Sequence, residues 1–491
     1  MAVSKEEFLR RFSQNLLEGT GAAFVGAGFS IPAGFADWRN LLREIATDLG
    51  LDVDHEYDLI AVAQYEINRK GTRDSLDDAI VRKFAREATV TENHRLLARL
   101  PIDTVWTTNY DSLLENVFRS VGKRVDLKIA PEQLRVRKPH VDVTIFKMHG
   151  DAEHSYEAVI SKDDYECYEA DRGAFTVQLL ADLLSKRFVF IGFSFTDPNI
   201  EYTFNRLRRL LNPQRRENAA PKEHYCILRK PQLGDYSKAK GSDDEKQKMF
   251  ERDLARFEHR LGDMRRLGVQ AVLIDDYSEI TTLLLALNRR VNTRRVMISG
   301  AAHDFAPFGE KRLEEFCRQL GRTLIEKGYD IVSGVGKGIS AAIMVGAHEA
   351  LSRPDAGRIG ERLKLFPFPY WYPDESKRLD YYRENRREMA AQAGVTIVIA
   401  GNKFDAARGG LIESPGVEAE LQEGRQHGHY VIPIGATGHA ARTAWKTVVA
   451  TPDSFPADVS AELATLGNEH ATDEQLIAAI LAVLEKIRNA I

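Results

Sequence analysis

The sequence has few cysteines and no excess of charge of either sign. Cys167, Cys226 and Cys317 are its only cysteines among 491 residues, and they lie far apart. Their spacing excludes a disulfide framework and gives no support for a structural zinc site, because both need closely spaced cysteines. With 68 Lys and Arg against 72 Asp and Glu, no net field attracts nucleic acid or an acidic membrane, so any anion site must be local.

Long hydrophobic runs are also missing. No strongly apolar, uncharged run reaches the ~20 residues that a membrane helix needs, and the uncharged stretch 21–36 is broken by four glycines and a proline. The first residues lead into charged positions and not into a signal-peptide core. The apolar fraction of 43% is typical of globular proteins, and the length predicts two to four domains. We expect a soluble, cytoplasmic, multidomain protein that binds neither membrane nor nucleic acid.

Short apolar segments alternate with helical patterns along the chain. In the first half they lie at 21–25, 103–107, 143–147, 187–192 and 224–228. This alternation is typical of a doubly wound parallel sheet. A fresh β-α-β pattern begins at residue 295, after a basic polar stretch, 288–295, that we interpret as a connector. The sequence therefore predicts an α/β protein with two tandem doubly wound domains, 1–288 and 289–491, each with a mostly parallel sheet.

Glycines and polar residues follow four of the predicted strands where each strand ends. They are Gly26-Ala27-Gly28-Phe29-Ser30, Thr108-Asn109-Tyr110-Asp111, His149-Gly150 and Gly192-Phe193-Ser194. The carboxyl ends of parallel strands meet at one edge of a sheet, so these clusters should converge on one crevice. Glycines let the backbone approach a pyrophosphate, and the free N–H groups of a following turn bind the anion. A dinucleotide pocket is the natural interpretation.

This ordered set of motifs resembles the sirtuin superfamily, particularly its bacterial-defence branch of NAD-consuming enzymes. The resemblance spans about residues 10–285 and implies a sirtuin-like Rossmann variant with NAD as substrate. It assigns NAD binding to a phosphate-and-ribose loop, a nicotinamide-site motif and an adenosine-side turn, which here are Gly26, Ala27, Gly28 and Ser30, then Thr108, then Gly192 and Ser194. The four-cysteine zinc ribbon of sirtuin deacylases has no counterpart, which favours metal-free NAD hydrolysis over deacylation.

Three polar residues are the catalytic candidates. Loss of nicotinamide from NAD leaves an oxocarbenium-like ribose, which needs charge stabilisation and an activated water. Asn109 can orient that water or bind the ribose, and Asp111 can hold a hydroxyl and offset the positive charge. His149, with an ordinary pKa near 6.5, is the natural general base. The alternative for a lone histidine is a satisfied core or surface group.

Glycine loops also follow the first two strands of the second half. They contain Ser299-Gly300 and Gly334-Val335-Gly336, and both can present backbone N–H groups to a phosphate. A basic helix around Arg386, whose charges could equally form a solvated face, precedes Lys403 and the segment 414–418.

This order resembles the SLOG family of Rossmann-like domains, relatives of phosphoribohydrolases that carry a Pro-Gly-Gly-x-Gly-Thr-x-x-Glu motif. Segment 414–418, Ser-Pro-Gly-Val-Glu, lacks the second glycine and the Gly-Thr pair. We therefore expect this domain to sense a ligand and not to hydrolyse one.

A sirtuin-like domain followed by a SLOG domain resembles the effector family of the Thoeris anti-phage system. The resemblance implies that the SLOG domain binds a cyclic ADP-ribose isomer, made by a TIR-domain partner protein, and thereby activates NAD hydrolysis in a homo-oligomer, a tetramer or larger. Arg386 and Lys403 would pair with ligand phosphates, because charge-assisted hydrogen bonds are strong, and Glu418 would bind hydroxyls or the base. Backbone positions complete the predicted pocket: Ser299, Gly300, Gly334, Gly336 and Gly416.

Two other functions stay open. A sirtuin-type NAD-dependent protein deacylase would use the same NAD pocket, and the missing zinc cysteines count against it. A non-catalytic nucleotide sensor that signals by assembly would need no general base. Nucleic-acid binding is disfavoured, because the arginines at 206–209 and 215–216 make only a local basic patch.

Overall fold

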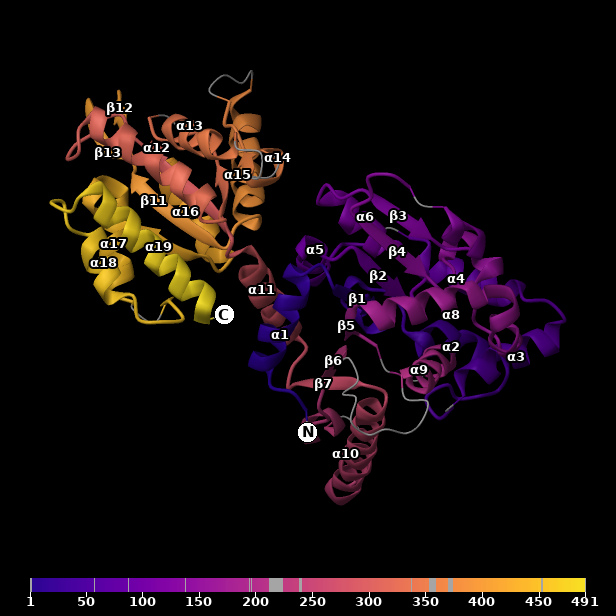
Figure 1. The fold of residues 1–491 in the computed structure, drawn as a ribbon. Helices are drawn as coiled ribbons and strands as arrows, with labels where there is room; N and C mark the ends of the chain where they lie inside the picture. Colours follow the sequence, from indigo (N-terminus) through magenta and orange to yellow (C-terminus); the bar gives the residue numbers. More distant parts are fainter. Residues whose placement is uncertain are drawn as a thin grey trace. The chain divides into compact units, whose positions relative to one another are not determined.

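Parallel strands separated by helices build both halves of the chain, as the sequence predicts (Figure 1). The computed structural model describes residues 2–56, 58–86, 88–136, 138–193, 195, 197–211, 224–237, 241–336, 338–352, 359–369, 374–451 and 454–490. Two compact units result, Met1–Leu287 and Asn288–Ile491. Each unit contains its own parallel sheet, so the predicted α/β class is confirmed.

The sheet of the first unit has the strand order β3-β4-β2-β1-β5-β6-β7, with every neighbouring pair parallel. Its strands are β1 (Gly21–Val25), β2 (Thr104–Thr107), β3 (Val125–Lys128), β4 (Val143–Lys147), β5 (Arg187–Ile191), β6 (His224–Arg229) and β7 (Val269–Ile274). Strand β3 was not predicted. Its inward-facing Asp126 and Lys128 form a buried ion pair at 2.8 Å, so its sequence lacks the apolar run that marks its neighbours.

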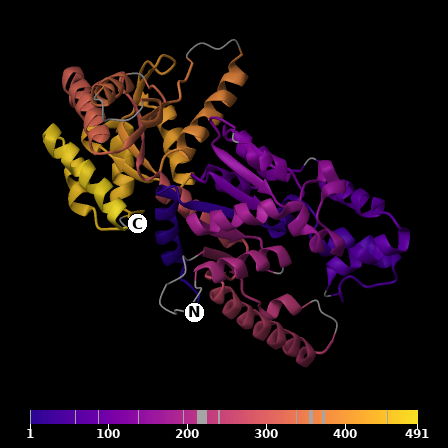
Figure 2. The same cartoon turned by 45° about the vertical axis from the view of Figure 1, so that its right-hand side comes forward.

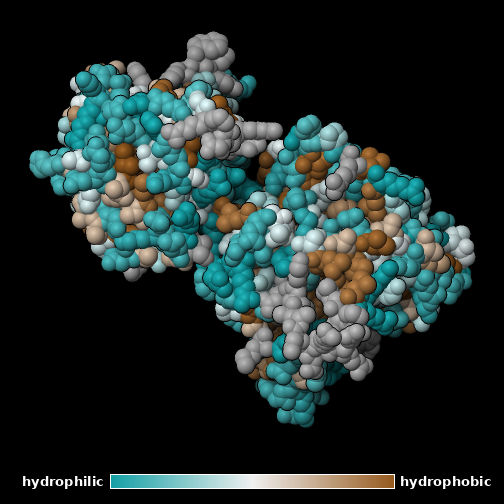
Figure 3. All heavy atoms as spheres, in the orientation of Figure 1, coloured by the Kyte–Doolittle hydropathy of each residue, from teal (hydrophilic) through white to brown (hydrophobic). Residues whose placement is uncertain are grey.

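Helices cover this sheet and form a separate small layer. They are α1 (Lys5–Leu17), α2 (Trp38–Asp48), α3 (Leu59–Lys70), α4 (Asp74–Phe84), α5 (Glu92–Arg99), α6 (Leu113–Ser120), α7 (Lys162–Glu166), α8 (Tyr168–Ser185), α9 (Pro198–Leu211), α10 (Asp243–Arg266) and α11 (Ser278–Asn292). Helices α2, α3 and α4 share a core of their own. Helix α10 buries only Phe257 and Met264, so the rest of its charged surface is a hydrophilic projection (Figure 3).

The second unit has the strand order β10-β9-β8-β11-β14, again parallel, with an added antiparallel hairpin. The sheet strands are β8 (Arg295–Ala301), β9 (Asp330–Ser333), β10 (Leu363–Leu365), β11 (Val395–Ala400) and β14 (Tyr430–Pro433); the hairpin is β12 (Asn402–Asp405) and β13 (Gly410–Glu413). Its helices are α12 (Glu310–Glu326), α13 (Ser340–Leu351), α14 (Ile359–Arg362), α15 (Glu375–Ala391), α16 (Pro415–Gln426), α17 (His439–Val449), α18 (Ser460–Leu466) and α19 (Asp473–Ala490).

Successive residues of the central strand β8 enter different cores, which explains its continuous apolar sequence. Val296 and Ile298 pack with Phe316 of α12, whereas Met297 packs with Met389 of α15 on the opposite face. A strand buried on both faces reads as an unbroken hydrophobic run. Helices accordingly lie on both sides of this sheet (Figure 2).

The interpretation of 288–295 as a polar connector is wrong. Helix α11 continues to Asn292, and β8 begins at Arg295. The helix continues because Leu287 and Val291 are buried on one of its faces. Arg289 uses its charge within the fold, since its guanidinium stacks over the Tyr430 ring at 4.3 Å and donates to the Tyr430 hydroxyl. Among the described residues, no helix is long and apolar enough to cross a membrane.

Candidate functional site

The glycine turn after β1 packs directly against the turn after β5. The Gly26 amide donates to the Ile191 carbonyl at 2.9 Å, and the Gly28 amide donates to the Gly192 carbonyl at 3.0 Å. A Cβ on Gly26 would lie 2.3 Å from the Gly192 oxygen, and Gly192 itself has φ +66°. Only glycine fits such a backbone approach. Ser194, which was predicted to extend this turn, lies outside the described residues.

Hydrogen bonds inside the glycine loop use several of the amides that were expected to face a phosphate. Beyond the two amides already described, the Phe29 amide donates to Gly26 and the Ser30 amide donates to Ala27. In this conformation the amides of Gly26, Gly28, Phe29 and Ser30 are therefore already paired and cannot bind a phosphate, although the glycines still allow a ligand to approach the backbone closely.

Asn109 ties the end of β2 to this loop. Its Nδ2 donates to the Gly26 carbonyl at 3.2 Å and to the Ser30 hydroxyl at 3.1 Å. The Asn109 amide donates to Thr107 Oγ1 at 2.9 Å, which fixes the turn that contains the half-buried Thr108. Asn109 is only 6% exposed, yet its Oδ1 has no hydrogen-bond partner among the described residues. The side chain thus holds one free acceptor in a fixed position.

Asp111 is a buried carboxyl with one unused oxygen. Its Oδ1 accepts the Leu113 amide at 3.1 Å, whereas Oδ2 has no hydrogen-bond partner in the described part of the chain. Burial raises the pKa of Asp111, against the positive charge of Lys147 and hydrogen bonds from the Leu113 amide and the Ser30 side chain. Lys147 Nζ donates to the Asp111 carbonyl at 2.8 Å and to Glu115 Oε1 at 3.2 Å. Sequence reasoning did not identify Lys147, which supplies the local positive charge.

His149 follows β4 and is 1% exposed. Neither ring nitrogen makes a hydrogen bond within the described residues, although Nε2 lies 3.5 Å from Asp197 Oδ2. Two tyrosine rings meet the imidazole edge-on, Tyr165 at 5.5 Å and Tyr168 at 6.0 Å. Burial lowers the pKa of His149, and the nearby Asp197 carboxylate partly opposes this. The ring is therefore neutral at neutral pH, which is the form that a general base requires.

These clusters lie at one edge of the sheet because β4, β2, β1 and β5 are consecutive neighbours. Direct hydrogen bonds join the β1 turn to Asn109 and to Gly192, and the Ala152 amide after β4 donates to the Tyr110 carbonyl at 3.0 Å. Within the described ranges, no three His, Cys, Asp or Glu side chains gather as metal ligands would.

The second unit gathers part of its predicted effector set around a residue that was not predicted, Glu420. Ser299 Oγ donates to Glu420 Oε2 at 2.6 Å, and a Cβ on Gly334 would lie 3.5 Å from Glu420 Oε1. Burial raises the pKa of Glu420 to about 7, against the hydrogen bond from Ser299 and the positive charge of Arg386.

Arg386 of α15 is held by aromatic rings. Its guanidinium lies 5.1 Å from the Phe368 ring centroid and 5.6 Å from that of Tyr382. A Cβ on Gly416 would lie 3.6 Å from Arg386 Nη2, so the start of α16 faces the same group. Gly336 packs on Gly300, because a Cβ on Gly336 would come within 2.5 Å of the Gly300 oxygen. Strand β8, helices α15 and α16, and the loops after β9 and β10 thus contribute to one end of this sheet.

Lys403 and Glu418 differ from the rest of the predicted effector set. Both are exposed, and no described contact joins either of them to Ser299, Arg386 or Glu420. Lys403 lies on β12, whose register pairs it with Ile412. Strand neighbours alternate between faces, so Lys403 and Phe404 lie on opposite faces of the hairpin.

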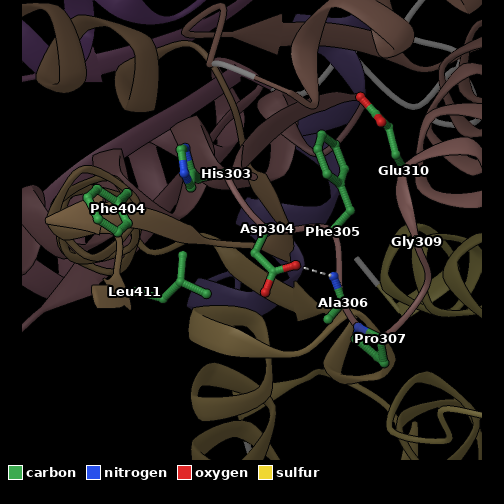
Figure 4. A pocket seen from close by; sticks show the side chains of 9 residues that line it. All are labelled: His303, Asp304, Phe305, Ala306, Pro307, Gly309, Glu310, Phe404 and Leu411. Atoms are coloured by element: carbon green, nitrogen blue, oxygen red, sulfur yellow. Dashed lines mark hydrogen bonds between the residues drawn. The ribbon is translucent and has the colours of Figure 1, made fainter. Parts of the chain in front are cut away.

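The face with Phe404 borders a cavity of about 670 Å³ (Figure 4). Its lining includes the His303 ring, 5.5 Å from that of Phe404, together with Leu411 and the carboxylates of Asp304 and Glu310. No residue of the predicted effector set lines this cavity.

Comparison with known proteins matches both halves of the chain to family models. A model described as the Sir2- and TIR-associating SLOG family matches residues 279–487, and one described as a SIR2-like domain matches residues 103–253. The NAD(+) hydrolase ThsA of Bacillus cereus (strain MSX-D12) is 35% identical over 489 residues, which cover 99% of this chain and 98% of that protein. This chain belongs to the ThsA family.

A second ThsA relative also matches over nearly its full length, and a defence-associated sirtuin matches over part of the chain. The NAD(+) hydrolase ThsA of Enterococcus faecium is 36% identical over 493 residues, covering 98% of this chain and 100% of that protein. Defense-associated sirtuin 2 of Bacillus subtilis is 26% identical over 215 residues, covering 42% of this chain and 21% of that protein. The predicted combination of a sirtuin-like and a SLOG domain is confirmed, and membership in the ThsA family follows from the full-length matches.

Four charged or polar side chains beside these sites escaped sequence reasoning: Lys147, Tyr165, Asp197 and Glu420. Asp197 lies three residues beyond the predicted Gly192-Phe193-Ser194 turn, and Glu420 lies two residues beyond segment 414–418. Nothing in either stretch of sequence indicates which side chain turns inward. Lys147, the last residue of β4, had a weak signal, since a lysine ending an apolar strand needs a partner when it is buried.

Proposed function

We propose that this ThsA-family chain is an NAD glycohydrolase whose residues 1–288 cleave the nicotinamide–ribose bond, giving nicotinamide and ADP-ribose. One observation carries the proposal: Asn109, Asp111 and His149 are all buried at one sheet edge, and each keeps a polar atom without a hydrogen-bond partner in the described structure. Buried polar atoms are normally paired. An unpaired set at the carboxyl ends of parallel strands marks the place of a polar ligand, and the relatives named NAD(+) hydrolase supply its identity.

Each of the three side chains has a role that its geometry permits. His149 is neutral because burial lowers its pKa, so it can take a proton from the attacking water or from a ribose hydroxyl. Asn109 offers its free Oδ1 to that hydroxyl or water from a position fixed by Gly26 and Ser30. Asp111, beside Lys147, places a carboxylate where positive charge develops on the ribose. The cationic nicotinamide ring favours the ionised form of this carboxyl, against the effect of burial.

Residues 289–491 act in this proposal as the sensor for a cyclic ADP-ribose isomer made by a TIR-domain partner protein. The Sir2- and TIR-associating SLOG match and the cluster of Ser299, Gly334, Arg386 and Gly416 support it. Activation requires the ligand to bind the active state more tightly than the resting one. A homo-oligomer, a tetramer or larger, is the two-state element, and NAD depletion in the cytoplasm is the anti-phage response.

The test is nicotinamide release by the purified full chain, with and without cyclic ADP-ribose isomers. We expect equal amounts of nicotinamide and ADP-ribose. In His149→Ala the rate of release should fall by at least about 100-fold, since positioned general bases contribute roughly 10²–10⁴-fold. His55→Ala is the control, because His55 is an exposed histidine of the same unit, 2.8 Å from Asp52.

Three results would contradict the proposal. An unchanged rate of nicotinamide release in His149→Ala rules out His149 as the general base. Acetyl-ADP-ribose formed from an acetylated peptide identifies a deacylase. Ligand-driven assembly without nicotinamide release from NAD, whichever isomer is added, identifies a non-catalytic sensor.

A further inference from the structure

The carboxylate closest to His149 belongs to Asp197, at the start of α9. Its Oδ1 accepts the amides of Asn199 at 3.0 Å and Ile200 at 3.2 Å, so one oxygen caps the helix. Its Oδ2 accepts the Tyr165 hydroxyl at 3.0 Å and lies 3.5 Å from His149 Nε2. Three donors therefore fix this carboxylate, whose side chain is 12% exposed, at the edge of the imidazole.

Tyr165 is a permanent donor in this arrangement. Burial, with the negative charge of Asp197 beside it, raises the pKa of Tyr165 well above its ordinary value. The hydroxyl therefore stays protonated throughout the range in which histidine titrates, and it donates to Asp197 over that whole range. One lone pair of Oδ2 remains for a further donor.

A neutral imidazole has a single N–H, and the position of that proton decides which nitrogen can act as a base. Within the described residues, the carboxylate in ion-pair contact with the ring is that of Asp197, on the Nε2 side. Hydrogen bonds of an active site are often long before substrate binds and shorten in the complex. A proton on Nε2 therefore has an acceptor, and Nδ1, buried and without a partner, is left as the basic nitrogen.

We propose that Asp197 is the positioning residue of His149: it accepts the Nε2–H, holds the imidazole in one tautomer and leaves Nδ1 to take the proton, while Tyr165 sets how much of the Asp197 charge reaches the ring. This inference rests on the proposed NAD hydrolysis, for which His149 is the base. Asp197 does not touch the reacting atoms. It acts through the histidine, as a carboxylate that orients a catalytic or metal-binding imidazole does elsewhere.

The charges that face His149 come from three elements. Asp197 at the start of α9 raises the pKa of His149, Arg172 of α8 lowers it, and Asp164 of α7 raises it, all against the larger effect of burial. Asp164 is itself paired with Arg73 at 3.2 Å. The tyrosines at 165 and 168 complete the surroundings of the ring without carrying charge.

Two single substitutions should move the titration of His149 in opposite directions. Asp197→Asn keeps the helix cap, since asparagine caps as well as aspartate does, but removes the charge, so the pKa of His149 falls. Tyr165→Phe removes a donor from Asp197 and leaves more of its charge acting on the ring, so the pKa of His149 rises. A merely structural role for either residue gives no reason for opposite signs.

The experiment uses the full chain labelled with ¹³C at histidine Cε1 and titrated by NMR from about pH 5 to pH 9, the range in which histidine changes charge. His149→Gln identifies the His149 signal. Nicotinamide release by each variant is measured over the same range. Because the base must be neutral, we expect the acid limb of the rate profile to move down in pH for Asp197→Asn and up for Tyr165→Phe. At its own optimum Asp197→Asn should lose about tenfold or more in kcat, with a smaller change in KM.

Asp58→Asn is the matched control, because Asp58 also caps a helix, accepting the Ala61 amide at 3.0 Å, at an exposed site. The inference is overturned if the pKa of His149 shifts in the same direction in Asp197→Asn and Tyr165→Phe, or if it shifts in neither. If Asp197→Asn does not fold, a downward or absent shift in Tyr165→Phe overturns it alone. If the two pKa shifts are opposite but the unsubstituted protein releases no nicotinamide, the interaction of Asp197 with His149 is supported and the proposed NAD hydrolysis is contradicted. If nicotinamide is released but the opposite shifts are missing, the proposed function is supported and the role of Asp197 is contradicted.

Discussion

The functional side chains at the edges of the two sheets differ in how deeply they are buried and in whether their polar atoms have partners. In the first unit, Asn109, Asp111 and His149 are at most 6% exposed and keep unpartnered polar atoms. In the second unit, Lys403 and Glu418 are exposed and Arg386 is half-buried against aromatic rings. Both edges share close glycine packing: the turn at Gly26 packs on the turn at Gly192, and Gly336 packs on Gly300, which lies within β8 and not in the predicted loop after it.

The difference corresponds to what each edge is proposed to do. A reaction site benefits from fixed, desolvated groups, which cost stability before the substrate arrives. A sensor for a charged nucleotide must admit the ligand and bind it with cations that lose little on ordering, as a stacked guanidinium does. If this contrast is correct, substitutions at the first edge separate activity from stability, whereas those at the second edge change affinity alone.

The largest effect is expected from Asp111→Asn. NAD hydrolysis should fall about 100-fold or more, because the charge that offsets the oxocarbenium is lost. Stability should stay equal or rise. Burial raises the pKa of Asp111 in the folded chain above its unfolded value, so ionisation disfavours folding increasingly as pH rises through that interval. The gain in Tm should therefore be larger at alkaline than at acid pH.

Asp126→Asn provides the matched comparison for that experiment. Asp126 is equally buried but is paired with Lys128 at 2.8 Å, so its substitution should lower the Tm, because removing one partner of a buried pair is destabilising. A large loss of Tm in Asp111→Asn, similar to that in Asp126→Asn, would remove the contrast between an unpartnered catalytic carboxyl and a structural one.

An intermediate effect is expected from Arg386→Ala. Calorimetry on the full chain should show affinity for the activating cyclic ADP-ribose isomer about 10- to 100-fold weaker, since a hydrogen bond to a charged group contributes about 1.5–3 kcal/mol. Arg383→Ala tests the same helix with an exposed arginine that pairs with Asp380 at 3.1 Å, and it should bind normally. Equal losses in both variants would show that α15 contributes only general positive charge.

The smallest effect is expected from Glu420→Gln. The pKa of Glu420 is about 7, so its carboxyl is mostly neutral at pH 6 and mostly charged at pH 8, where it competes with ligand phosphates for Arg386. Affinity for the cyclic ADP-ribose isomer should fall a few-fold, on the order of threefold, over this range in the unsubstituted protein and stay flat in Glu420→Gln. Glu418→Gln should keep the pH dependence; losing it there instead would place Glu418, and not Glu420, at the ligand.

Much of the fold followed from local patterns, and the failures have local causes. The apolar runs that became β1, β4 and β11 were visible because both faces of each strand are buried. Strand β3 was missed because Asp126 and Lys128 satisfy each other inside, and the β12–β13 hairpin was missed because Lys403 and Phe404 give no apolar alternation. The connector was misjudged because the charge of Arg289 is used against Tyr430, 141 residues away.

The sequence by itself determined the two α/β units, the glycine turns and the polar residues at strand ends, because these depend on neighbours along the chain. Only the tertiary structure decided which distant groups meet. Asp197 and Tyr165, 32 residues apart, converge on His149. Glu420, and not Glu418, turns towards Ser299, since residues two apart on a helix point about 200° from each other and packing alone selects the inward face.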